Sequence, residues 1–281
     1  MEEFETGQDT VSVERLVDNL TLFDDDLMSL VFDRNNSATE LLLKIILRKD
    51  DIEVVNVIGQ KELENPLVTG RNIRLDILAR DNTGRTYNVE VQRSNSGGDE
   101  RRARFHSSMV DIRMLKAGQD FKELKESYII FITKEDYFGC GLPIYTIHRH
   151  FEEIDRIFED GSHIIYVNGS YRGDDPIGRL MHDFDCKDSK DIYYSQLANG
   201  VRHFKEEGGR AVVCQAVKEY AKEYAKEYAK EYANKVAIKT AIETGIEYKI
   251  ERNLIIENVC KKFGIAKAEA EEIYCKIISE A

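Results

Sequence analysis

The chain has 281 residues, is 42 % hydrophobic and carries a net charge of -12, and its 3 prolines and 18 glycines argue against a disordered or collagen-like protein. A mean hydropathy of -0.45 and the lack of any apolar run near ~18 residues exclude a membrane-spanning helix. The start is acidic and polar, unlike a signal peptide, and the five cysteines form no CxxC pair. We therefore expect a cytoplasmic protein with reduced cysteines and no membrane partner.

The first part of the chain is expected to be an acidic arm followed by a helix. Residues 1–26 are acidic and polar, which predicts a frayed or loosely docked arm. Residues 27–47 carry apolar side chains at helical spacing. Within them, Ser37 and Glu40 have the spacing of a capping box, which predicts an N-cap at Ser37.

The middle of the chain alternates between strand and helix patterns. Strands are predicted over 54–58, 72–79, 86–92, 128–133 and 163–168, and a helix over 101–115. The second and third strands are joined by Asp81-Asn-Thr-Gly84, which favours a tight hairpin turn. A polar, glycine-containing loop is expected over 94–99. This order predicts an α/β (α+β) fold with a mixed β-sheet core flanked by helices, ending near residue 170.

The chain reads as helical from Asp188 onward, and it contains four tandem Lys-Glu-Tyr-Ala copies between Lys218 and Ala233. Each copy exceeds one helical turn by about 40°, so its tyrosines form a slowly winding stripe. We expect three segments: the arm over 1–26, a core domain over 27–208 and a helical region over 209–281.

The C-terminal helical region is expected to mediate self-association, because one small domain cannot bury such long apolar stripes. The alternative is a repeat produced by tract expansion and tolerated because the helix is soluble. Gly245 is the expected break between the tyrosine and isoleucine segments, and Gly264 is expected to end the helix.

Three polar residues of the hairpin form a candidate catalytic set. If the hairpin is centred near Thr83, Asp76 lies opposite Glu90, and Gln92 shares a strand face with Glu90. Carboxylates can hold a divalent cation, and a neighbouring polar group can orient an attacking water. The alternative is a solvated outer face with incidental acids. No metal-ligand cluster of histidines and cysteines is expected, although His182 and Cys186 share a helical spacing.

The segments 74–84 and 87–93 resemble the PD-(D/E)XK nuclease superfamily, and more narrowly its recombination-promoting nuclease and transposase branch. The resemblance continues through 102–109, 128–133, 141–145, 160–168 and 180–184, and covers about residues 25–210. It implies a restriction-endonuclease-like fold and a hydrolase that acts on DNA with Mg²⁺ or Mn²⁺.

The resemblance also implies residue roles. Asp76 and Glu90 would hold the metal, and Gln92 would stand where the wider superfamily has a lysine. Glu40 matches an acidic residue that often completes the metal site, with helix capping as the alternative.

Arg102 and Arg104 are the candidate DNA-phosphate ligands. On a helix they diverge by about 200°, so both cannot face one phosphate. Arg102 is preferred from its match to the family pattern. The alternative for either arginine is a surface ion pair with Asp99 or Glu100.

A metal-dependent DNA endonuclease is therefore the leading hypothesis. The net charge opposes DNA binding, yet residues 71–125 hold 12 Lys or Arg against 8 Asp or Glu. Two alternatives stay open. One is a catalytically weak or inactive DNA-binding or regulatory protein, favoured by glutamine in place of lysine. The other is an interaction protein whose helical tail is the functional part and whose nuclease site is vestigial.

Overall fold

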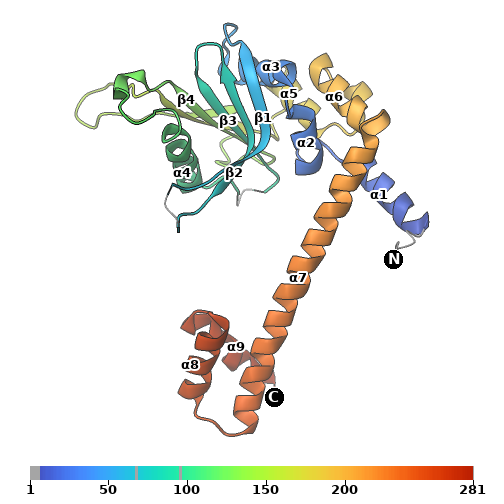
Figure 1. Ribbon diagram of the computed structural model, residues 1–281, viewed down its shortest axis with the longest axis vertical. Coiled ribbons are helices and arrows are strands. Elements are labelled where there is room, and N and C mark those ends of the chain that lie inside the picture. The colour runs from blue at the N-terminus through green and yellow to red at the C-terminus, as the bar shows by residue number, and fades with distance from the viewer. Residues whose placement is uncertain (1–6, 67–68, 95–96, 281) are drawn as a thin grey trace. The chain divides into compact units, whose positions relative to one another are not determined.

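The computed structural model describes residues 7–66, 69–94 and 97–280 (Figure 1). Contacts divide the chain into two compact units, Met1–Val217 and Lys218–Ala281. The division falls after Val217, beyond the position 208 expected from the sequence. The first unit contains the sheet and the second is helical.

The first unit is built on a six-stranded sheet in the order β1-β2-β3-β4-β6-β5. Its strands are β1 (Val54–Leu63), β2 (Ile73–Asp81), β3 (Thr86–Gln92), β4 (Ser127–Thr133), β5 (Ile144–Ile147) and β6 (Ser162–Asn168). β3, β4 and β6 are parallel to one another, whereas β1–β2, β2–β3 and β5–β6 are antiparallel. The expected mixed sheet is confirmed, and β5 is a strand that the sequence pattern did not predict.

The turn between β2 and β3 is held by one buried carboxylate. Asp81 accepts hydrogen bonds from the Thr83 N–H, the Thr83 hydroxyl, the Arg85 N–H and the Tyr87 hydroxyl. Gly84 has φ of 89°, a left-handed conformation that suits glycine. The pairs Ile77↔Val89 and Arg80↔Thr86 centre the hairpin on Thr83, as expected.

Helices cover both faces of the sheet (Figure 1). Those of the first unit are α1 (Gly7–Asn19), α2 (Asp25–Phe32), α3 (Asn36–Leu47), α4 (Glu100–Asp111), α5 (Pro176–Asp185) and α6 (Ser195–Glu206). The main hydrophobic cluster joins α2, α3, α5 and α6 to one face. A smaller cluster joins α4 to the other face. The flanked sheet that results is a restriction-endonuclease-like arrangement.

Two local expectations differ from the structure. The N-cap of α3 is Asn35, whose side chain accepts from the Ala38 N–H, so the capping box expected at Ser37 is wrong. Leu22 and Phe23 are buried at 0 % and 1 % exposure, so the end of the expected loose arm belongs to the core. Residues 1–6 lie outside the described part.

The second unit packs three helical segments around its own small core. α7 (Arg210–Glu247) begins in the first unit, and α8 (Arg252–Phe263) and α9 (Lys267–Glu280) follow it. The buried residues of this core are Ile238, Ile242, Ile255, Ile256, Val259 and Ala270. Gly264 ends α8 in the left-handed conformation, as expected. Gly245 does not break α7; a Cβ at this position would lie 2.8 Å from Ile255, so the glycine permits close packing of α7 and α8. Among the described helices, none combines the length and apolar character that crossing a bilayer requires.

Candidate active site

The candidate acids meet where β2 and β3 separate. Described pairing between the two strands runs only from Ile77 to Arg80 on β2, so Asp76 is the first residue beyond it. The Val91 N–H donates to Asp76 Oδ2 at 2.9 Å, and the Asp76 N–H donates to Glu90 Oε1 at 3.4 Å. These two contacts close the end of the hairpin through side chains. The structure thus brings Asp76 and Glu90 together.

The two carboxyls share a site that is poor in water and rich in negative charge. Glu90 is fully buried, at 0 % exposure. Burial and then the Glu90 carboxylate raise the pKa of Asp76 to about 8, although the Val91 N–H and Arg102 oppose the shift. Asp76 therefore holds a proton at neutral pH in the metal-free protein. A bound cation would compete with that proton.

Arg102 links the acids to Gln92. Its Nη2 donates to Glu90 Oε2 at 3.0 Å, and its Nη1 donates to Gln92 Oε1 at 3.4 Å and to the Gly97 carbonyl at 3.3 Å. Arg102 sits in the first turn of α4, which Asp99 caps by accepting from the N–H groups of residues 101 and 102. Because its side chain is still 38 % exposed, the guanidinium lies at the mouth of the site. Arg104 is exposed and makes no such contact with the site in the described hydrogen bonds.

Asp25, at the start of α2, is an acid that the sequence analysis missed. Burial raises its pKa, while Arg74 lowers it and Glu90 raises it. The Asp25 carboxylate in turn raises the pKa of Asp76. As a whole residue Asp25 is exposed, although burial of its carboxyl is the largest cause of the raised pKa. The signal was present as three consecutive aspartates, residues 24–26, directly before an apolar helix.

Glu40 is engaged elsewhere. Its carboxylate accepts from Lys44 Nζ at 2.8 Å and from the Val54 N–H at 3.0 Å, which ties α3 to the start of β1. The hydrogen bond from Lys44 lowers the pKa of Glu40. The structure does not bring Glu40 to Asp76 and Glu90. The role of Glu40 in completing the metal site therefore stays a prediction.

Comparison with known proteins places this geometry in a family. Residues 30–168 match the family described as PD-(D/E)XK nuclease family transposase. This stretch, just under half of the chain, is a domain of that family. The match includes Asp76, Glu90, Gln92 and Arg102, and leaves out Asp25 and the whole second unit. Comparisons with curated proteins and with solved structures found no match.

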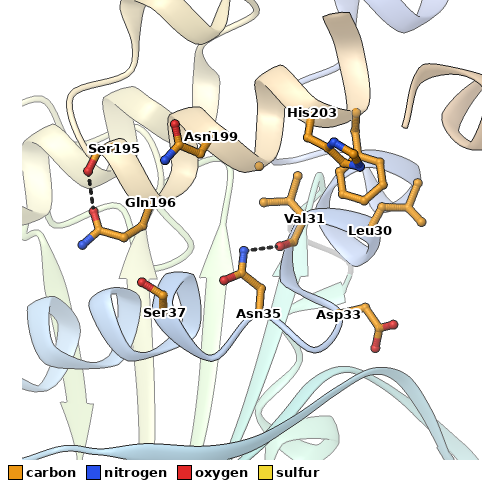
Figure 2. Close-up of a pocket in the computed structure, with 11 residues that line it drawn as sticks. Leu30, Val31, Asp33, Asn35, Ser37, Ser195, Gln196, Asn199 and His203 are labelled. Atoms are coloured by element: carbon orange, nitrogen blue, oxygen red, sulfur yellow. Dashed lines mark hydrogen bonds between the residues drawn. The ribbon is translucent and has the colours of Figure 1, made fainter. Parts of the chain in front are cut away.

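The nuclease domain also has a cavity of about 500 Å³ away from these acids (Figure 2). It lies between the turn that joins α2 to α3 and the helix α6. Its polar side chains are largely engaged within the fold: Asn35 caps α3 and donates to the Val31 carbonyl, and Ser195 donates to Gln196. We assign it no part in the chemistry.

A second cluster of ligand-type side chains lies at the end of α5, where His182, Asp183 and Cys186 come together. The sulfur is 3.4 Å from Nδ1 and 3.8 Å from Nε2 of His182, so it sits beside the ring and not along the lone pair of either nitrogen. Asp183 already accepts from the N–H groups of Tyr193 and Tyr194. This arrangement fixes the start of α6 and does not present a metal site.

Proposed function

We propose that this protein is a DNA endonuclease that hydrolyses phosphodiester bonds with the help of a divalent cation. The observation that carries the proposal is the meeting of Asp76 and Glu90 beside Arg102 and Gln92. Asp25 lies near enough for its charge to act on Asp76. Membership of a nuclease family supports hydrolysis of nucleic acid. We further propose a role in recombination or in the movement of mobile elements, in the cytoplasm.

The donor set fits Mg²⁺ or Mn²⁺. Both ions prefer carboxylate and other oxygen ligands, and Asp76, Glu90 and Asp25 supply only such atoms. The raised pKa of Asp76 supports the same assignment, because burial and then the Glu90 carboxylate disfavour its charged form, and a cation between the acids would offset both effects. We propose Asp76 and Glu90 as the principal ligands and Asp25 as the third acid. When bound, the cation would supply a Lewis acid that polarises the phosphate and lowers the pKa of a water.

Gln92 would orient the attacking water, and Arg102 would neutralise negative charge on the phosphate. The Gln92 carbonyl oxygen can accept a hydrogen bond from the attacking water and fix its direction. Glutamine carries no charge, so it cannot replace the electrostatic contribution of a lysine at this position. Arg102 lies within hydrogen-bond distance of Gln92 and Glu90, and it would supply positive charge to the scissile phosphate.

Cleavage of supercoiled plasmid tests the proposal. Wild-type protein should nick the plasmid with Mg²⁺ and not with EDTA, and Asp76→Ala should lose the activity while still folding. Loss of at least about 100-fold is expected, because the substitution removes a metal ligand. Nicking that persists in Asp76→Ala would show that the activity belongs to another site or to a contaminant.

A second candidate function is DNA binding with little or no catalysis. Glutamine at position 92 and the net charge of -12 favour it. This function predicts that the protein shifts the electrophoretic mobility of the plasmid but forms no nicked product, with either Mg²⁺ or Mn²⁺. The same plasmid assay therefore separates the two functions.

We also propose that the chain self-associates through its C-terminal helical region. Tyr220, Tyr228 and Tyr232 of α7 are each at least 60 % exposed, and the Tyr224 side chain lies outside the described residues. Aromatic side chains exposed at regular helical spacing favour helix-to-helix association. A dimer would present two nuclease domains to one DNA duplex.

A further inference from the structure

A buried chain of polar side chains runs behind the proposed catalytic residues, from β3 to α4. Asn88 and His106 are 0 % and 2 % exposed. The Asn88 amide nitrogen lies 3.2 Å from His106 Nδ1, and the Arg102 Nε–H donates to His106 Nε2 at 3.4 Å. His106 Nδ1 also lies 3.5 Å from Glu90 Oε1. The imidazole thus touches the metal-binding acid with one nitrogen and the phosphate-binding arginine with the other.

Counting donors and acceptors fixes the state of this ring. The Nε of Arg102 can only donate, so Nε2 of His106 must accept and carries no hydrogen. In a neutral imidazole the hydrogen is then on Nδ1, and the group facing Nδ1 must accept it. The Glu90 carboxylate, a group that can only accept when ionised, lies on that side of the ring, with Oε1 at 3.5 Å from Nδ1. An imidazolium would carry a hydrogen on Nε2 as well, and that N–H would face the Nε–H of Arg102, which is repulsive.

The side-chain amide of Asn88 gives an independent sign of the same arrangement. As placed, its nitrogen points at Nδ1, which is already a donor, while its oxygen is buried without a hydrogen-bond partner. The oxygen and nitrogen of an amide are distinguished only by their hydrogen bonds. Turning the amide by about 180° brings the oxygen to the Nδ1–H, so that the oxygen gains a donor and the two donors no longer face each other.

We propose that His106, as its Nδ1–H tautomer, is a positioning residue that holds the Arg102 guanidinium in the orientation needed for phosphate. The inference rests on the proposed function of Arg102. The guanidinium has donors in one rigid plane, so a bond to Nε fixes the direction of the other two nitrogens. Those nitrogens donate to Glu90 and Gln92. Without the Nε2 acceptor, the partly exposed side chain of Arg102 regains rotamers that point away from the site.

Two conservative substitutions of His106 separate positioning from simple filling of space. The amide oxygen of glutamine can take the place of Nε2, whereas the shorter asparagine reaches only the place of Nδ1. His106→Gln should therefore keep the Arg102 contact, and His106→Asn should lose it. Circular dichroism and thermal unfolding of the full chain would establish that both variants fold.

The first readout is the kinetics of plasmid cleavage. His106→Asn should lower kcat by roughly 10- to 100-fold, the usual cost of losing a residue that orients a site, with KM changed much less. His106→Gln should stay within about threefold of wild type. Equal rates for both variants and wild type, or equal losses in both, would overturn the proposal.

The second readout does not depend on activity. Nitrogen-15 NMR of the full chain should show His106 as the Nδ1–H tautomer and a slowly exchanging Arg102 Nε–H that is absent in Arg102→Lys. That signal should survive in His106→Gln and vanish in His106→Asn. An Nε2–H tautomer in the wild-type protein would overturn the proposal even if a variant failed to fold. A wild-type protein that never cleaves DNA would refute the proposed function, while the tautomer and the Arg102 signal would still decide the positioning.

Discussion

At the residue scale, Asp76 couples the protonation of the candidate site to the stability of the fold. Its pKa is raised from 3.8 to about 8. Between these values the folded metal-free protein holds a proton that the unfolded chain has released. The free energy of unfolding therefore falls as the pH rises through this window. The stability that the protonated Asp76 contributes to the folded protein is fully present below pH 3.8 and is lost as the pH rises to about 8.

Asp76→Asn should remove this pH dependence. Asparagine stays neutral at all pH values, so the metal-free variant should be more stable than wild type near pH 9 and differ little near pH 5. Thermal unfolding with EDTA at the two pH values checks the prediction. A stability difference that is the same at both would mean that Asp76 ionises normally.

The three acids of the α2 start allow a matched test of the third ligand. Asp25→Ala should weaken Mn²⁺ binding by about tenfold or more, because it removes a carboxylate that interacts with Asp76 and Glu90. Asp26→Ala is the control, since its charge interactions are only with its neighbouring aspartates. Calorimetric titration with Mn²⁺ measures both affinities.

Glu40→Gln should bind Mn²⁺ as wild type does. A loss of Mn²⁺ affinity in that variant would instead identify Glu40 as the third acid.

At the element scale, the contact of α7 with α8 depends on one position without a side chain. An alanine at a helix interior normally stabilises it by about 1 kcal/mol relative to glycine. At Gly245 the added Cβ would lie 2.8 Å from the buried Ile255 and force the helices apart. Gly245→Ala should therefore destabilise the second unit. Hydrogen exchange of amides in α8 and α9 should accelerate, whereas Gly208→Ala, with open space around it, should leave them unchanged.

Strand patterns predicted the sheet well because alternation and turn chemistry are local. The Asp81–Gly84 turn and the alternation of β3 together specify the hairpin register, and hence the meeting of Asp76 and Glu90. Helix starts were predicted less well. Asparagine and serine are both favoured N-cap residues, so propensity alone does not choose between Asn35 and Ser37. In the structure Asn35 also donates to the Val31 carbonyl of α2, a contact that the sequence does not reveal. Asp25 was missed for the same reason, because its approach to β2 and β3 depends on contacts far apart in the sequence.

At the scale of the whole molecule, the net charge of -12 should make DNA binding weak and salt-sensitive. The excess of Lys and Arg over Asp and Glu in residues 71–125 would offset part of the repulsion of the phosphate backbone. Affinity for a DNA duplex should fall at least about tenfold between 50 and 200 mM salt. Fluorescence anisotropy with a labelled duplex measures it. A flat salt dependence would contradict recognition of the backbone.

Self-association should be lost when the second unit is removed. The full chain has a mass of 32.4 kDa and should scatter light as a dimer or larger species at micromolar concentration. A chain that ends at Val217 should still fold, because it keeps Val213 and Val217 packed on α1. It should be a monomer, because it lacks the helical region proposed to self-associate. If the full chain and the shortened chain are both monomers, the helical region has another role.

Among the described side chains, none of the Lys-Glu-Tyr-Ala tract belongs to the buried cluster that precedes it in the sequence or to the one that follows it. The last buried side chain before it is Val217 and the first after it is Ile238. A gain or loss of one four-residue copy would therefore change the length of α7 by about one helical turn and would leave Val217 and Ile238 in their own cores. The number of copies thus sets the length of this helix in steps of about one turn, independently of which side chains the two cores bury.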